Sequence, residues 1–381
     1  MTKLKIKQIC FIFLAFVPTT KVLLMPAAVS SVSGNDAYLT VLLNSLIDFC
    51  VIAAVLYACK KNDSMTFFEL IEERLGKVGA RVIAALYALY FLFKMYAPLM
   101  EQKTFLEVSL YESTPRSFFF LPFFAISVFS CVKGIKAMGR CAEVMLLFTI
   151  PAFIMIFALS LGNADFGALL PIAYKNTADI FGGLKKSMLW FGQGIYMIFF
   201  MGNFRYEKGA SLKILLSYAA SALVIVFFTM LFYATFADIS LRQHYAVLKI
   251  ARYSLILSSM GRFDFLAIFL LITSTVYALT LPVLFGTECL IKTVGFKKRL
   301  IPSLIINGIL ICAMIFTDRY FNLIMNVIVQ YLSIPFAIFA YIFPAIISLT
   351  MIKKSKGKTK KSSFTGSGQK IKVSLDKEKS L

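Results

Sequence analysis

Two long apolar segments of this chain are each interrupted near the middle, and these interruptions limit what the chain can fold into. One segment, residues 8–30, contains Pro18-Thr19-Thr20, and the other, residues 186–203, contains Gly192-Gln193-Gly194. Proline removes a hydrogen-bond donor and glycine weakens helical backbone, so we expect both segments to unwind at these points. Unwound backbone cannot face lipid, because its N–H and C=O groups would stay unpaired, so it must line a cavity or contact a bound group.

The composition is typical of a protein embedded in a membrane. Hydrophobic residues make up 59% of the 381 residues, 39 residues are Phe, and the mean hydropathy is +0.81. These values exclude a soluble globular protein, and apolar runs of about 20 residues are long enough to cross a bilayer as helices. The sequence predicts an all-α membrane protein with ten transmembrane helices, at residues 8–30, 37–59, 78–106, 117–132, 138–160, 186–203, 211–236, 262–291, 300–316 and 322–351.

The two interrupted segments are the first and the sixth of these ten spans. Each half of five spans contains an odd number, so the two halves are expected to lie in opposite orientations across the membrane. This five-plus-five inverted repeat, with broken helices one and six, is the plan of a large class of secondary transporters. Broken spans at matching positions of two repeats indicate a binding site near the middle of the bilayer, within one transporter-like domain over residues 1–352.

The formal net charge of +21 is distributed as in a multi-pass membrane protein. If both termini are cytoplasmic, Lys and Arg gather in cytoplasmic loops such as Lys60-Lys61 and Lys297-Lys298-Arg299, whereas the external loop 31–36 has none. This positive-inside bias predicts a cell-membrane protein rather than a nucleic-acid-binding one. The Lys, Ser and Gly composition of residues 353–381 predicts a disordered cytoplasmic tail beside the anionic leaflet.

Three ionisable residues, Lys21, Asp48 and Lys94, fall near the membrane midplane when depth is counted at about 1.5 Å per residue. Ionisable groups at this depth face the protein interior and pair with a partner. One carboxylate against two ammonium groups leaves a positive charge that the carboxylate of a ligand could meet. Two alternatives stay open: a neutral lysine that serves proton coupling, or a purely structural Lys21–Asp48 pair.

Further polar residues lie on the same predicted spans. Asn44 is four residues before Asp48, hence on the same helical face, where it could hydrogen-bond the charged pair. Glu101 is seven residues after Lys94 and is interpreted as an interfacial carboxylate near the outer entrance. Thr273-Ser274-Thr275 could coordinate Na⁺ together with carbonyls of the first span, and bonding to their own helix is the alternative.

The interruption in the sixth span carries the only tryptophan of the chain, in Trp190-Phe191-Gly192-Gln193-Gly194. The glycines would allow close approach to a ligand and the aromatic rings could cover it, although plain helix packing is also compatible with the glycines. The predicted ligand-binding residues are Pro18, Thr19, Thr20, Lys21, Lys94, Trp190, Phe191, Gly192, Gln193 and Gly194. The predicted charge or coupling network is Asn44, Asp48, Thr273, Ser274 and Thr275.

Several classes of enzyme lack their required residues in this sequence. His244 is the only histidine, which removes HExxH zinc chemistry and histidine-based redox sites. Gly357-Lys358-Thr359 resembles the end of a P-loop but lacks the preceding glycine spacing. The seven cysteines form no CxxC pair and are interpreted as small apolar residues. We therefore expect neither an enzyme nor a bound cofactor or metal.

Five local motifs resemble those of a known family, over about residues 5–350. They are Leu23-Leu24-Met25-Pro26, Phe68-Glu69-Leu70-Ile71 followed by Leu75-Gly76-Lys77, Lys133-Gly134-Ile135 with Arg140-Cys141-Ala142-Glu143, Leu169-Leu170-Pro171, and Arg262-Phe263-Asp264. On these motifs the chain resembles the B-subunit family of bacterial spore germinant receptors, which belongs to the amino acid–polyamine–organocation transporter superfamily. The basic tail after Ile352 is longer than is typical of that family.

The resemblance implies a ten-helix inverted-repeat core that binds a small amino-acid-like ligand and signals germination from the spore inner membrane. It also implies partners, namely an A subunit and a C-subunit lipoprotein. The fold alone does not separate a sensor from a transporter. A proton-coupled amino-acid permease is therefore the alternative function, and a structural membrane subunit with a vestigial site is a third.

Overall fold

The computed structural model describes residues 4–61, 65–110, 120–174, 176–253 and 263–348, and helices make up most of these residues. No strand occurs in those ranges apart from one isolated bridge between Leu4 and Phe204. The helices are α1 (Ile6–Thr19), α2 (Met25–Ser33), α3 (Ala37–Lys61), α4 (Phe67–Leu110), α5 (Leu121–Lys133), α6 (Ile135–Leu161), α7 (Thr177–Ser187), α8 (Gly194–Phe200), α9 (Ala210–Phe236), α10 (Ala246–Tyr253), α12 (Phe263–Val294), α13 (Leu300–Thr317), α14 (Phe321–Val327) and α15 (Ser333–Ala337).

The first span is broken, as its proline predicts. Helix α1 ends at Thr19, residues 20–24 are not helical, and α2 begins at Met25. The break begins slightly later than the sequence indicates, because Pro18 and Thr19 still complete the last turn of α1. The hydroxyls of Thr19 and Thr20 donate to carbonyls of that turn, which satisfies acceptors that the break would leave open.

The sixth span is broken at the predicted glycines. Helix α7 leads into a 3₁₀ turn, Met188–Trp190, the chain is unwound over 191–193, and α8 starts at Gly194. The predicted start of this span at residue 186 is wrong, since α7 begins at Thr177. Residues 177–185 include Asp179 and Lys185, and such polar residues hide a helix from a search for apolar runs.

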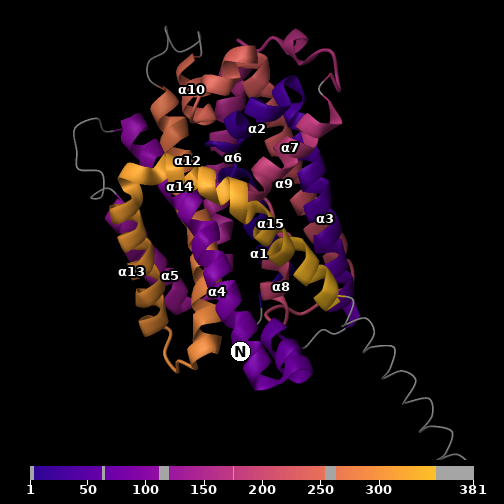
Figure 1. Ribbon diagram of the computed structural model, residues 1–381, viewed down its shortest axis with the longest axis vertical. Helices are drawn as coiled ribbons and strands as arrows, with labels where there is room; N and C mark the ends of the chain where they lie inside the picture. Colours follow the sequence, from indigo (N-terminus) through magenta and orange to yellow (C-terminus); the bar gives the residue numbers. More distant parts are fainter. Residues whose placement is uncertain (1–3, 62–64, 111–119, 175, 254–262, 349–381) are drawn as a thin grey trace, which may run out of the picture.

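The two broken spans run antiparallel, so that their breaks meet. Helix α2 packs on α7, and Figure 1 shows both in the upper half of the molecule with α8 below them. On the other side of the breaks, the rings of Phe16 on α1 and Tyr196 on α8 lie 4.8 Å apart, centre to centre. The backbone N–H of Leu4 donates to the carbonyl of Asn203 at 2.8 Å, which joins the start of the first span to the end of the sixth.

The long helices α3, α4, α6, α9 and α12 surround the broken pair. Helix α9 packs on α1 and α3, whereas α12 packs on α4 and α6. Helix α4 bends at Gly76, whose φ of 72° suits glycine and separates the amphipathic residues 67–75 from the apolar remainder. Helices α14 and α15 alternate with π-helical turns at Ile328–Leu332 and Ile338–Ile342 and cross in front of the bundle (Figure 1).

The protein is an all-α membrane protein. In the described ranges six segments are long and apolar enough to cross a membrane, and α1 and α5 are shorter apolar helices. One of the six segments, Leu300–Ser348, covers the ninth predicted span and the described part of the tenth. The count of ten spans and the inverted repeat therefore stay predictions, and the predicted tail at 353–381 lies outside the described residues.

Candidate ligand-binding site between the broken helices

Two buried charges hold the break in the sixth span. The backbone N–H of Gly192 donates to both carboxylate oxygens of Asp48, each at 3.1 Å. From the other side, the Lys94 ammonium donates to the carbonyl of Leu189 at 3.2 Å and to that of Phe191. Asp48 on α3 is 0% exposed and Lys94 on α4 is 5% exposed. The two side chains thus replace helical hydrogen bonds that the unwound segment lacks.

Gly192 is required at the centre of this arrangement. Its φ of 91° lies in the region that glycine favours, and a Cβ there would approach the Cβ of Ala340 to 2.7 Å. The positive φ and the close approach of Ala340 together exclude any larger residue at position 192, unless the helical turn that carries Ala340 moves. The predicted unwinding at this glycine is confirmed.

Lys21 lies in the unwound part of the first span and reaches the same place. Its ammonium is 4.5 Å from the centre of the Phe191 ring, and the side chain is 1% exposed. Asp48 and Lys94 are close enough to act on it electrostatically. Among the described residues no direct ion pair joins Lys21 to Asp48, whose hydrogen bonds go to Gly192 and to the Tyr218 hydroxyl at 3.3 Å. The three midplane charges therefore meet at Phe191-Gly192 rather than as a simple pair.

Glu101 is a fourth buried charge of this cluster. It accepts a hydrogen bond from the Trp190 indole N–H at 2.9 Å and another from the backbone N–H of Leu24, and it is 1% exposed. Its interpretation as an interfacial carboxylate is wrong, because the carboxylate ties the two breaks together. The sequence feature that could have indicated this buried position is the seven-residue spacing, which places Glu101 on the same face of the helix as Lys94. Two carboxylates now face two ammonium groups, so the surplus positive charge inferred from the sequence is absent from this cluster.

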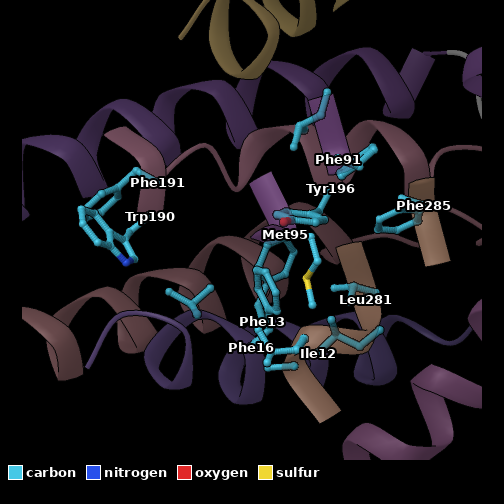
Figure 2. Close-up of a cluster of buried hydrophobic side chains, with 14 of the residues drawn as sticks. Ile12, Phe13, Phe16, Phe91, Met95, Trp190, Phe191, Tyr196, Leu281 and Phe285 are labelled. Atoms are coloured by element: carbon cyan, nitrogen blue, oxygen red, sulfur yellow. The ribbon is translucent and has the colours of Figure 1, made fainter. Parts of the chain in front are cut away.

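A small cavity lies between the breaks. It has a volume of about 20 Å³ and is lined by Thr20 of the first break, Lys94, and Trp190 and Gln193 of the second break, together with apolar side chains. A volume of this size holds about one water molecule. The rings of Phe16 and Tyr196 pack edge to face, and Figure 2 shows Trp190 and Phe191 set apart from them. The structure is therefore closed around the candidate site.

Two polar atoms at this place have no hydrogen-bond partner in the part of the chain that the structure describes. They are the Gln193 side-chain oxygen and the Tyr90 hydroxyl, and both are buried. Gln193 lines the cavity, and the Tyr90 hydroxyl is 3.6 Å from the point where a Cβ of Gly192 would stand. Buried polar atoms are almost always paired, so these two mark hydrogen-bonding capacity that the folded chain leaves open. Tyr90 was not identified from the sequence, where nothing separates it from its aromatic neighbours.

Asn44 does not bond the charged pair. Its amide donates to the Ser187 hydroxyl at 2.7 Å and to the Leu184 carbonyl at 3.4 Å, so it fastens α3 to α7 instead. The expected hydrogen bond to the charged pair is absent because helical spacing places Asn44 and Asp48 on one face of α3 but does not say which neighbouring group the Asn44 amide bonds.

The hydroxyls of Thr273, Ser274 and Thr275 each donate to a carbonyl four residues earlier on α12. Ser274 also accepts from Thr149 of α6 at 3.0 Å. This is the alternative that the sequence left open, and these hydrogen bonds involve none of the four buried charged residues. Within the described ranges no group of three His, Cys, Asp or Glu side chains could hold a metal ion.

Comparisons with known proteins cover nearly the whole chain. A family model described as "Spore germination protein" matches residues 3–322. Spore germination protein KB of Bacillus subtilis (strain 168) is 22% identical over 371 residues, which cover 94% of this chain and 97% of that protein. Spore germination protein YndE of the same organism is 23% identical over 212 residues, 55% of this chain and 58% of that protein.

Proposed function

The chain belongs to the spore germination protein family, and we propose that it is the membrane subunit of a nutrient germinant receptor. In this proposal a small amino-acid-like ligand binds at the midplane between the two broken spans, and binding signals spore germination. The subunit works with an A subunit and a C-subunit lipoprotein in the spore inner membrane, with both termini in the cytoplasm. It performs no enzymatic step.

The unpaired polar atoms beside the cavity carry this proposal. The Gln193 oxygen and the Tyr90 hydroxyl lie where the unwound backbone, the four buried charged groups and the only Trp converge. An unpaired buried polar atom costs roughly 1–3 kcal/mol, and a ligand that bonds it recovers that free energy. A buried site that leaves such atoms open supports ligand binding better than it supports plain packing.

The charge balance favours a ligand without net charge. Lys21, Lys94, Asp48 and Glu101 sum to zero when all are ionised, and a zwitterionic amino acid would keep this balance. Lys94, Asp48 and Glu101 already hold backbone or indole groups, whereas Lys21 faces the Phe191 ring. We therefore assign Lys21 to the ligand carboxylate, and Gln193 and Tyr90 to its remaining polar groups.

The test is the Lys21→Met variant, measured as germination of spores that carry it and as abundance of the protein in their membranes. We expect abundant protein with a strongly reduced response, because Asp48 keeps its bonds to Gly192 when Lys21 is lost. If Lys21 served only to neutralise Asp48, the variant would lose roughly 3–5 kcal/mol of stability, and the double variant Lys21→Met/Asp48→Asn would restore both abundance and response. That restoration would refute the assignment.

A proton-coupled amino-acid permease is the second candidate, and the buried ionisable cluster is the observation that favours it. Uptake of labelled amino acids into vesicles that contain this chain alone would establish the permease. Copurification with a lipoprotein partner, without uptake, would establish the receptor subunit.

A further inference from the structure

A second and larger pocket lies on the other side of Trp190. It has a volume of about 300 Å³ and lies among α2, α7, the segment before α10, and α14, so we name it the α2–α7 pocket. Its polar and aromatic lining includes Ser31, Lys186, Trp190, His244, Phe321 and Asn322. With the predicted topology it opens on the external side. Mostly apolar pockets of this volume with a few polar groups are typical of sites for small molecules.

The lining of this pocket is unbalanced in charge. Lys186 is its one lysine or arginine, and no carboxylate occurs among the described lining residues. The ammonium of Lys186 is half-buried and donates to the Ser31 hydroxyl at 2.6 Å. No ion pair to Lys186 is present in the described ranges, so the pocket holds a cation that only a neutral hydroxyl meets. An anionic group of a ligand would be attracted there.

A neighbouring pocket carries charges of both signs. It has a volume of about 290 Å³, shares Leu24, His244, Phe321 and Asn322 with the α2–α7 pocket, and is also lined by Glu107, Asp318 and Arg319. Asp318 pairs with Lys103 at 2.5 Å. Lys103 also pairs with Glu107, at 3.8 Å, so these carboxylates are already balanced, and the charge open to a ligand in this region is that of Lys186.

Trp190 separates the α2–α7 pocket from the small cavity. The residue lines both spaces, and Glu101 holds its indole N–H. The small cavity of about 20 Å³ is closed to an amino acid in this structure, whereas the α2–α7 pocket of about 300 Å³ can admit one.

We propose that the α2–α7 pocket is a capture site for α-amino acids with uncharged side chains. The ligand carboxylate binds Lys186, and the apolar side chain lies against Trp190 and Phe321. The ligand class rests on the proposed function. The site itself is separate from the one at Lys21 and is occupied before it.

Trp190 provides the measurement, because as the only tryptophan it reports directly from the floor of the pocket. The full chain is reconstituted in lipid nanodiscs, and its tryptophan fluorescence is titrated with single α-amino acids of uncharged side chain and with their carboxamides. We expect at least one amino acid to change the fluorescence at millimolar concentration. Its carboxamide should bind about tenfold more weakly or worse, since it lacks the charge that Lys186 meets.

Three variants locate the binding. Lys186→Met should weaken binding about tenfold or more, whereas Lys185→Met, the exposed neighbour outside the pocket, should bind as the wild type. Ser31→Ala removes the same hydrogen bond without removing the charge, and it should also bind as the wild type. Equal losses in Ser31→Ala and Lys186→Met would mean that local structure was lost, and they would overturn the proposal. Equal binding of amino acid and carboxamide would overturn it too.

A variant at the inner site separates this proposal from the proposed function. Lys21→Met should keep the fluorescence response, because the capture site is intact. If Lys186→Met binds as the wild type while Lys21→Met loses binding, the capture site is refuted and the proposed function stands. If no amino acid in the series changes the fluorescence of the wild type, the capture site is refuted, whereas the proposed function is still decided by the germination response of Lys21→Met.

Discussion

Tyr90→Phe is expected to stabilise this protein and to impair its ligand response. The Tyr90 hydroxyl is buried with no partner in the described chain, and the ring packs against Tyr87, Phe91, Phe336 and Phe339. Phenylalanine keeps these ring contacts and removes only the unpaired oxygen. An unpaired buried hydroxyl costs roughly 1–3 kcal/mol, so the variant should gain about 1 kcal/mol, which raises Tm by roughly 1–2 °C.

Tyr87→Phe is the matched control for this change. Tyr87 lies one helical turn earlier in the same aromatic cluster, and its hydroxyl donates to the Phe339 carbonyl at 3.2 Å. Removing a made hydrogen bond should cost about 1 kcal/mol, so Tm should shift in the opposite direction. Thermal unfolding in detergent, read by tryptophan fluorescence, measures both shifts. The germination response should fall for Tyr90→Phe and persist for Tyr87→Phe.

Equal destabilisation of the two variants would refute the reasoning, because it would show that Tyr90 has a hydrogen-bond partner in the folded state. A stabilised Tyr90→Phe variant with a full response would refute the ligand role alone. The sign of the Tm shift and the response thus test two separate steps of the argument.

Three further predictions concern the break and the topology. Gly192→Ala should destabilise the protein by roughly 1–3 kcal/mol, because alanine disfavours φ of 91° and would meet Ala340; unchanged Tm would show that the segment adapts freely. Glu101→Ala should cost roughly 1–3 kcal/mol, since it strands the Trp190 indole N–H, and an unshifted Trp190 emission spectrum would contradict this. Cysteine labelling should find residues 31–36 external and residues 133–140 and 381 cytoplasmic; external labelling of residue 381 would overturn an even number of spans.

The sequence predicted the elements that depend on local chemistry. Proline in an apolar span and a glycine pair in another gave both breaks, because backbone constraints act wherever the residue lies. The midplane positions of Lys21, Asp48 and Lys94 followed from apolar run length, because lipid requires buried charges to find partners. That these charges meet at the unwound residues 191–192 was not predicted, because it depends on how the helices pack.

Pairings between helices could not be read from spacing. Asn44 bonds Ser187 on α7, and Glu101 bonds Trp190 near the centre, and both choices depend on how the helices rotate against each other. The first part of α7 was missed because it contains polar residues such as Asp179 and Lys185, which interrupt an apolar run. The unpaired hydroxyl of Tyr90 is a property of packing alone, so no pattern in the sequence indicates it.

The contacts at the break connect what a ligand would touch to what has to move. The cavity holds about one water, so an amino acid can enter only if the break moves away from α4. Asn44 fastens α7 to α3, whereas the far end of the sixth span bonds the start of the first through Leu4 and Asn203. The displacement is therefore expected in α8 and the start of α1 rather than in α7. A sensor and a permease both need this movement, and they differ in whether the ring contacts of Tyr196 with Phe16, Phe91 and Phe285 open afterwards.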